Sequence, residues 1–343
     1  MTETRQTASG APLLQVDGLS KQFGARGGLA GFFGGGSGVS LIAVDSATFQ
    51  IYTGEILGLV GESGSGKTTL GRCLLRLIEP SCGQVRFDGT DLLGLSKPDL
   101  RVARRQMQMI FQDPYSALNP RMTVRQMLTE VLRFHRVRPE SAIPARVAEL
   151  LALVGLAEDS ADRLPRHFSG GQRQRIGIAR ALAVEPRFIV ADEPVSAVDV
   201  SVQAQIMNLL LDLRDRLELT ILFIAHDMSV VRYVSDRVGV LYLGRIVEIG
   251  TRAQIFSDPR HPYTQALLRA APRPDPGRPP AQAAITGEPP SPLNPPPGCH
   301  FHTRCPLASA RCKSEAPVLE SVADGHHVRC HHHDLARHLQ STG

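Results

Sequence analysis

The stretch HFSGGQRQRIGIARAL, residues 167–182, decides the fold of this chain. Its most informative part is the run Ser169, Gly170, Gly171 and Gln172. Two adjacent glycines let the backbone come close to a ligand, and a hydroxyl and an amide add polar contacts. Apolar residues then recur at helical spacing, at Ile176, Ala179 and Leu182. The motif therefore begins a helix, where free N–H groups and the helix dipole favour an anion.

A glycine-rich loop, GESGSGKT, lies upstream between an expected strand at 56–60 and an expected helix with Leu70, Leu74 and Leu77 on one face. It matches the pattern G-x-x-x-x-G-K-[ST], in which backbone N–H groups surround phosphates and the lysine reaches the β and γ oxygens. The hydroxyl residue after the lysine binds magnesium. The candidate nucleotide-binding residues are Gly61, Ser63, Gly64, Ser65, Gly66, Lys67, Thr68 and Thr69, with Thr68 also a magnesium ligand.

A continuous apolar run at 188–191 is typical of a buried parallel strand, and it ends in Asp192, Glu193 and Pro194. Asp192, at the carboxyl end of the strand, is expected to bind magnesium. Glu193 is expected to orient or deprotonate an attacking water. With the phosphate loop upstream, this pair predicts hydrolysis of a nucleoside triphosphate.

The order of these motifs resembles that of the ATP-binding cassette (ABC) ATPases over about Leu13 to Gly250. The resemblance implies an α/β fold: an ABC-type P-loop nucleotide-binding domain with a RecA-like core, an antiparallel β subdomain and a helical subdomain. It implies ATP and Mg²⁺ as cofactors. It also implies that Ser169 to Gln172 complete the ATP site of an opposing subunit.

The same resemblance implies roles in nucleotide binding and hydrolysis for further residues. Gln112, in IFQDPYSALNP, contacts magnesium or the attacking water, and Asp199 belongs to a loop that crosses a dimer interface. His226 follows an apolar strand and contacts the γ-phosphate. The implied catalytic residues are thus Glu193, His226, Lys67 and Gln112. Phe23 is expected to stack on adenine, although a core phenylalanine is nearly as plausible from the residues alone.

Composition sets bounds on the kind of protein. The 343 residues carry a net charge of +5 without a concentrated basic stripe bearing aromatics, which argues against a nucleic-acid partner. No apolar stretch approaches the ~18 residues of a membrane helix. The start, MTETRQTASGAPLLQ, lacks an apolar core of the signal-peptide kind. We therefore expect a protein on the cytosolic side that reaches a membrane only through partner chains.

The positions of glycine- and proline-rich segments and the changes in composition divide the chain into three parts. Residues 1–260 form the nucleotide-binding domain, with a helical subdomain at about 97–168, a glycine-rich excursion at 24–40 and a hairpin turning at Gly244. Residues 261–298 form a connector that is proline-rich from Pro272 to Pro297. Residues 299–343 form a small cysteine-rich C-terminal module.

Four cysteines of the last part have the spacing C-x5-C-x6-C-x17-C: Cys299, Cys305, Cys312 and Cys330. In a cytosolic ATPase, clustered cysteines are more often metal ligands than disulfides. Thiolates suit a 4Fe–4S cluster or zinc, and the spacing does not choose between them. Inert thiols on a surface loop are the alternative.

The segments HPYTQALL and GCHFHTRCPLASARC narrow the resemblance to ATPase subunits of dipeptide and oligopeptide ABC importers. The runs IFQDPYSALNPRMTV and ADEPVSAVDVSVQAQI carry it too. That family includes importers of nickel, opines and glutathione, and an iron–sulfur cluster in some members favours 4Fe–4S over zinc for the four cysteines.

Such a subunit has definite partners. The resemblance implies a second ABC ATPase subunit (a paralogue or the same chain), two transmembrane permease subunits and an extracytoplasmic solute-binding protein. It places the chain peripherally on the cytoplasmic face of the inner membrane. A soluble ABC ATPase that does not transport is the competing class, but such proteins usually carry two cassettes or long coiled-coil insertions.

Overall fold

The structure is a computed structural model that describes residues 10–24, 40–113, 115, 118–196, 198–270 and 287–338. The chain divides into two compact units, each built from several stretches of sequence. The first unit consists of Met1–Leu13, Ile51–Ile56 and Asp88–Ala225. The second consists of Leu14–Gln50, Leu57–Phe87 and His226–Gly343. The phosphate loop thus belongs to the second unit, and the SGGQ motif belongs to the first.

The first unit contains three parallel strands, β6 (Met107–Ile110), β7 (Phe188–Asp192) and β8 (Thr220–Ile224). Met107 pairs with Phe188, and Phe188 pairs with Thr220. Every residue of β7 and β8 is buried, which explains why both read as continuous apolar runs. The short strand β5 (Thr90–Asp91) and helix α2 (Lys97–Arg105) precede them.

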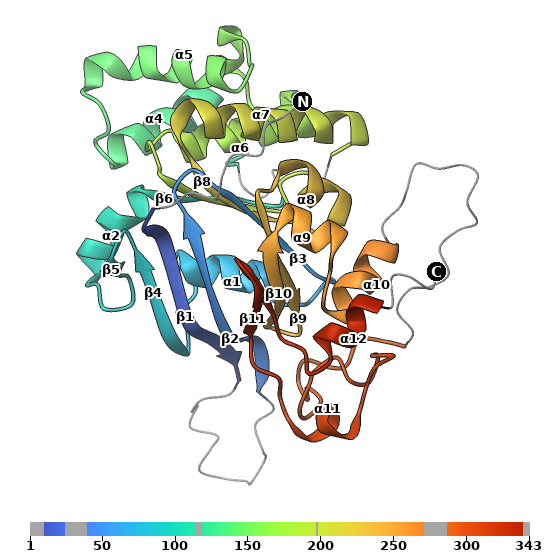
Figure 1. The fold of residues 1–343 in the computed structure, drawn as a ribbon. Coiled ribbons are helices and arrows are strands. Elements are labelled where there is room, and N and C mark those ends of the chain that lie inside the picture. Colours follow the sequence, from blue (N-terminus) through green and yellow to red (C-terminus); the bar gives the residue numbers. More distant parts are fainter. Residues whose placement is uncertain are drawn as a thin grey trace, which may run out of the picture. The chain divides into compact units, whose positions relative to one another are not determined.

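Four longer helices of the first unit pack on one another (Figure 1): α4 (Val124–Phe134), α5 (Ile143–Leu153), α6 (Gly170–Leu182) and α7 (Val200–Leu217). Short 3₁₀ turns lie at Glu140–Ala142, Glu158–Asp162 and Pro165–His167. Thr123 and Gln126 form a capping box that starts α4. The range expected to be helical, 97–168, therefore holds α2, α4 and α5, with strand β6 between α2 and α4.

In the second unit, strands β2 (Leu41–Tyr52), β1 (Pro12–Phe23) and β4 (Cys82–Phe87) lie side by side in that order (Figure 1). β1 and β4 are antiparallel, with Leu14 opposite Phe87. The predicted excursion at 24–40 lies outside the described residues between 25 and 39.

The other sheet of this unit holds β11 (Glu320–Ala323), β12 (His326–Val328), β10 (Arg245–Thr251), β9 (Arg237–Tyr242) and β3 (Ile56–Val60), in that order. The predicted hairpin is confirmed: β9 and β10 are antiparallel, and Gly244 has a φ of 79° in the turn. β3 instead runs parallel to β9. Residues from the far C-terminus thus extend a sheet that contains β3, the strand before the phosphate loop.

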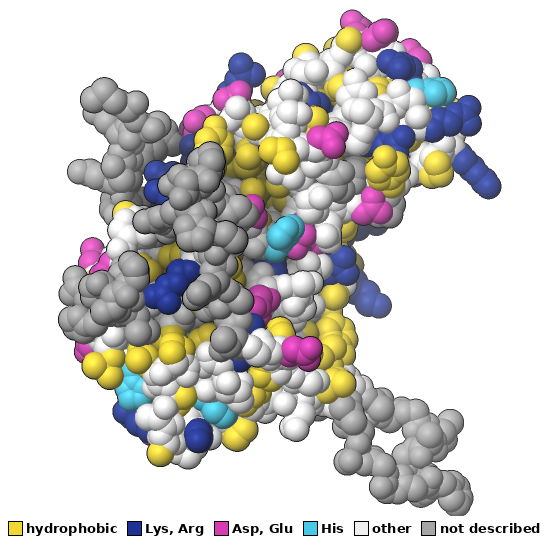
Figure 2. Space-filling view, turned by 90° about the vertical axis from the view of Figure 1, so that its right-hand side faces the viewer, with side chains coloured by type: hydrophobic (Ala, Val, Ile, Leu, Met, Phe, Trp, Pro, Cys, Tyr) yellow, Lys and Arg dark blue, Asp and Glu magenta, His cyan; other side chains and the backbone are white. Residues whose placement is uncertain are grey.

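Six helices complete the described part of the second unit: α1 (Lys67–Leu74), α8 (Met228–Val234), α9 (Arg252–Ser257), α10 (Pro262–Ala270), α11 (Ala310–Ser314) and α12 (His333–His338). Among the described residues, no helix of either unit is both long and apolar enough to cross a membrane. On the face shown in Figure 2, Lys and Arg side chains stand between acidic, apolar and uncharged ones. The positive charge on this face is therefore spread out.

Candidate nucleotide-binding site

The phosphate loop connects β3 to α1, as its sequence context predicted. Gly66 is the N-cap of α1, with a φ of 103°, and as a glycine it offers no side-chain oxygen to cap the helix. A Cβ on Gly66 would lie 2.0 Å from the carbonyl oxygen of Ala43, and one on Gly61 would lie 2.2 Å from that of Leu241. Both positions therefore exclude a side chain. Backbone N–H groups at the start of a helix can bind an anion, which fits a phosphate.

Lys67 is directed into the loop that precedes it. Its side chain is buried, and Nζ donates to the carbonyl oxygens of Gly61 at 2.7 Å and Glu62 at 2.9 Å. Of the other predicted loop residues, Ser63 and Gly64 are exposed, Ser65 is buried, and Gly66, Thr68 and Thr69 are half-buried. The lysine is therefore held by the loop itself, at the start of α1.

Two more predicted residues belong to the second unit. Phe23 ends β1 with 38% of its surface exposed, so it is not a core residue, and Lys21 Nζ lies 4.8 Å from the centre of its ring. An exposed aromatic ring is free to stack on a base. His226 is exposed just before α8, whose first turn is capped by Asp227 through a 2.7 Å bond from the Ser229 N–H.

The acidic pair of the first unit lies at the end of β7. Asp192 is 1% exposed, whereas Glu193 turns out of the strand with a φ of 45°. The Glu193 N–H donates to the carbonyl of Ile224 on the neighbouring strand at 3.0 Å. Gln112, after β6, donates from Nε2 to a carboxylate oxygen of Glu193 at 2.9 Å. The structure therefore brings together two of the predicted catalytic side chains, Gln112 and Glu193.

The SGGQ motif begins α6, as predicted. Ser169 is the N-cap: its hydroxyl accepts from the Gln172 N–H, and the Gln172 side chain accepts from the Ser169 N–H at 3.0 Å. A Cβ on Gly171 would lie 2.3 Å from a methyl group of Val202 on α7. Gly171 therefore allows close helix packing, a role that sequence reasoning did not foresee. Gly170 is the first residue of α6, and Asp199 is exposed at the start of α7.

A glycine loop before a helix, a buried lysine in that loop, and an acidic pair after a buried parallel strand define a P-loop nucleoside triphosphatase. Comparison with known proteins shows to which family of P-loop nucleoside triphosphatases the chain belongs. Residues 44–196 match the ABC transporter family, and residues 247–312 match the family described as oligopeptide/dipeptide transporter, C-terminal region.

Relatives of known name cover almost the whole chain. A Brucella abortus protein whose name assigns it to peptide import is 51% identical over 330 residues, which are 96% of this chain and 98% of the relative. The oligopeptide transport ATP-binding protein AppF of Bacillus subtilis is 50% identical over 292 residues, 84% of this chain and 89% of the relative. The chain therefore belongs to the ATP-binding proteins of ABC transporters, which are ATPases.

Solved structures agree on the fold. The cassette cbiO1 from Clostridium perfringens has a TM-score of 0.61 at 26% identity, covering 72% of this chain and 91% of its own. A bacterial ABC transporter cassette solved as a dimer has a TM-score of 0.60 at 28% identity, covering 70% of this chain and 98% of its own. The P-loop fold and the resemblance to peptide-importer ATPases are both confirmed.

The predicted metal centre at Cys299, Cys305, Cys312 and Cys330, iron–sulfur or zinc, is wrong. Within the described ranges, no group of three or more His, Cys, Asp and Glu side chains is arranged to hold a metal ion. Burial raises the pKa of Cys305 to about 11 and that of Cys330 to about 12, so both are neutral thiols in this structure.

The reason for the error is that the C-terminal segment shares a core with the rest of the second unit. Phe301 is 2% exposed, with its ring centre 5.2 Å from that of Tyr242 on β9 and 5.4 Å from that of Tyr263 on α10. Strand β12 pairs with β10, Val328 opposite Glu248. A segment that buries its apolar side chains against other elements does not need a metal to fold.

Proposed function

We propose that this chain is the ATP-hydrolysing subunit that energises an importer of di- and oligopeptides. The observation that carries the solute class is the match of residues 247–312 to the C-terminal region of oligopeptide and dipeptide transporters. The names of relatives about half identical to this chain point to the same class of solute. Importers of nickel, opines or glutathione are the alternative within the same group.

The proposal keeps the roles in nucleotide binding that were expected from the sequence. In the second unit, the loop from Gly61 to Thr69 binds the phosphates, Phe23 stacks on adenine and His226 contacts the γ-phosphate. Thr68, Gln112 and Asp192 are the proposed ligands of Mg²⁺. The close backbone approach at Gly61 and Gly66 before α1 and the exposure of Phe23 support these roles.

Glu193 is proposed to orient or deprotonate the water that attacks the γ-phosphate. Its support is the 2.9 Å bond from Gln112, which fixes the carboxylate. Lys67 and His226 stabilise the negative charge that develops on the γ-phosphoryl oxygens. A bound Mg²⁺ would neutralise further phosphate charge.

A second cassette, either a paralogue or another copy of this chain, completes each site in this proposal. Ser169, Gly170, Gly171, Gln172 and Asp199 act on the nucleotide held by the opposing phosphate loop. The fold similarity to a cassette that was solved as a dimer supports this arrangement. Closure on ATP and reopening after hydrolysis drive two permease subunits, while a solute-binding protein delivers the peptide outside.

The same proposal places the chain peripherally on the cytoplasmic face of the inner membrane. It keeps three sequence divisions: the nucleotide-binding domain at 1–260 with its helical subdomain at about 97–168, the connector at 261–298 and the C-terminal segment at 299–343. The described residues 226–270 and 287–338 fall in one compact unit, which supports a C-terminal segment packed on the rest of that unit.

Transport by the assembled complex tests the solute class. The chain is co-expressed with permease and solute-binding subunits and reconstituted in proteoliposomes, and uptake of a labelled tripeptide is measured with ATP or ADP. We expect ATP-dependent uptake that unlabelled peptides suppress. Uptake of Ni²⁺, an opine or glutathione with no peptide uptake would contradict the peptide assignment and leave the ATPase assignment intact.

A further inference from the structure

An ion pair joins the C-terminal segment to the phosphate loop. The Arg304 guanidinium donates from its two terminal nitrogens to the two carboxylate oxygens of Glu62, at 2.8 and 3.0 Å. The Arg304 side chain is 5% exposed and that of Glu62 is 26% exposed. Such a two-pronged pair fixes both direction and distance, so it is more than a surface contact.

Every other polar group of Glu62 also has a partner. Its N–H donates to the Tyr263 hydroxyl at 2.9 Å, and its carbonyl accepts from Lys67 Nζ at 2.9 Å. One residue of the phosphate loop therefore connects helix α10, the C-terminal segment and the lysine that is to meet the γ-phosphate. A shift of Arg304 would act on Lys67 through a single residue.

Arg304 is itself held in place by its surroundings. Its guanidinium carbon lies 6.0 Å from the ring centre of Tyr242, and a terminal nitrogen lies 3.5 Å from the Tyr242 hydroxyl. Tyr242 and Tyr263 contact each other with ring centres 4.6 Å apart, and both contact Phe301. The aromatic cluster fixes the segment that carries Arg304 beside the loop.

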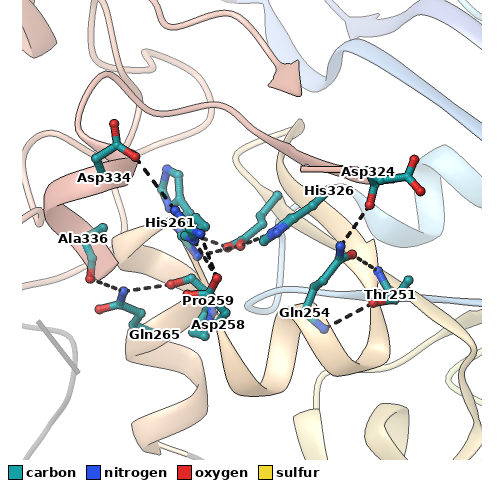
Figure 3. Close-up of polar contacts among 12 residues, drawn as sticks. Thr251, Gln254, Asp258, Pro259, His261, Gln265, Asp324, His326, Asp334 and Ala336 are labelled. Atoms are coloured by element: carbon teal, nitrogen blue, oxygen red, sulfur yellow. Dashed lines mark hydrogen bonds and ion pairs between the residues drawn. The ribbon is translucent and has the colours of Figure 1, made fainter. Parts of the chain in front are cut away.

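The rest of the C-terminal segment is fastened to β10, α9 and α10 (Figure 3). Glu248, which is fully buried on β10, accepts from the N–H groups of Arg260 and His261 and bonds to His326 at 2.8 Å. Gln254 and Gln265 donate to the carbonyl oxygens of Asp324 and Ala336. The C-terminal segment is thus firmly attached to these elements, and its Arg304 holds a fixed positive charge beside Glu62 of the phosphate loop.

A carboxylate in a loop that binds a triphosphate needs a partner. An unpaired Glu62 would repel the phosphates and disfavour their binding. We propose that Arg304 is a positioning residue of the nucleotide site: it cancels the charge of Glu62 in the phosphate loop, so that the C-terminal segment sets the affinity for ATP. The proposal rests on the proposed binding of ATP by this loop.

The experiment measures MgATP affinity and the KM and kcat of hydrolysis for full-length variants. Arg304→Met should weaken MgATP binding about tenfold, raise KM similarly and leave kcat within about twofold, because one uncancelled negative charge remains in the loop that binds the triphosphate. Adding Glu62→Gln to Arg304→Met should restore the affinity to within about threefold of the wild type. Arg304→Lys, which keeps the charge but not the fork, should lie between.

Arg311→Met is the matched control, because Arg311 forms an equally short pair with Glu315 in the same segment but is 59% exposed. It should leave the affinity unchanged. Unchanged affinity in Arg304→Met, or a loss that Glu62→Gln does not reverse, would overturn the inference. If Arg304→Met does not fold, Glu62→Gln alone decides: affinity at least equal to wild type supports the inference, and a tenfold loss contradicts it. Failure of the wild-type chain to bind MgATP would refute the proposed function instead.

Discussion

Replacing Gly171 by alanine separates two roles of the SGGQ motif. The new Cβ would lie 2.3 Å from a methyl group of Val202, and ordinary contacts begin at 3.4 Å, so α6 and α7 must move apart by roughly 1 Å. Overpacking of this kind costs about 1–3 kcal/mol, and alanine at the second position of α6 returns only part of the about 1 kcal/mol that it gains over glycine in a helix interior. We therefore expect Gly171→Ala to lower the free energy of unfolding by about 1–2 kcal/mol.

Urea denaturation followed by circular dichroism measures this cost, and Val202→Ala in the same chain is the control. The double variant should regain most of the lost stability, because removing the Val202 methyl groups makes room for the new Cβ. ATP turnover of the assembled complex should stay low in the double variant if Gly171 also contacts the opposing nucleotide. A Gly171→Ala protein as stable as the wild type would refute the packing argument.

Two further predictions concern the second unit. Burial lowers the pKa of His261 to about 3 and that of His300 to about 4, against 6.5 in the unfolded chain. Because the unfolded chain binds these protons more readily, the stability contributed by each neutral histidine is fully present above pH 6.5 and is lost as the pH falls. The loss in unfolding free energy is about 2 kcal/mol for each residue at pH 5. The urea midpoint should therefore drop between pH 6.5 and pH 5, and a constant midpoint would contradict this prediction. His326→Ala leaves Glu248 without one of its buried partners and should lower the free energy of unfolding by about 1–3 kcal/mol. His333→Ala removes a more exposed pair with Glu320 and should lower it by less than about 1 kcal/mol. Equal losses in the two variants would contradict a stabilising role of the buried pair.

Features with a local signature were predictable from the sequence. The phosphate loop, the strand that ends in Asp192 and the hairpin at Gly244 each depend on residues that are neighbours in the chain. Apolar runs, helical spacing and turn glycines record such structure directly. These parts of the fold and of the candidate site therefore appeared at the expected positions.

Features that depend on distant partners were not predictable. Arg304 meets Glu62 across 242 positions, and nothing near either residue marks the pair. The packing of Gly171 on Val202 is hidden in the same way. The cysteines were misjudged because their spacing was read as that of an independent module, whereas Phe301 shares a core with Tyr242 and Tyr263.

The most direct test of the account is the substitution Glu193→Gln, with MgATP affinity and ATP turnover measured on the same preparation of the assembled complex. An amide at this position preserves the shape of the side chain beside Gln112 but cannot accept a proton from water. We predict turnover at least about 100-fold lower with affinity within about threefold of the wild type. Turnover within about tenfold of the wild type would show that hydrolysis does not depend on Glu193.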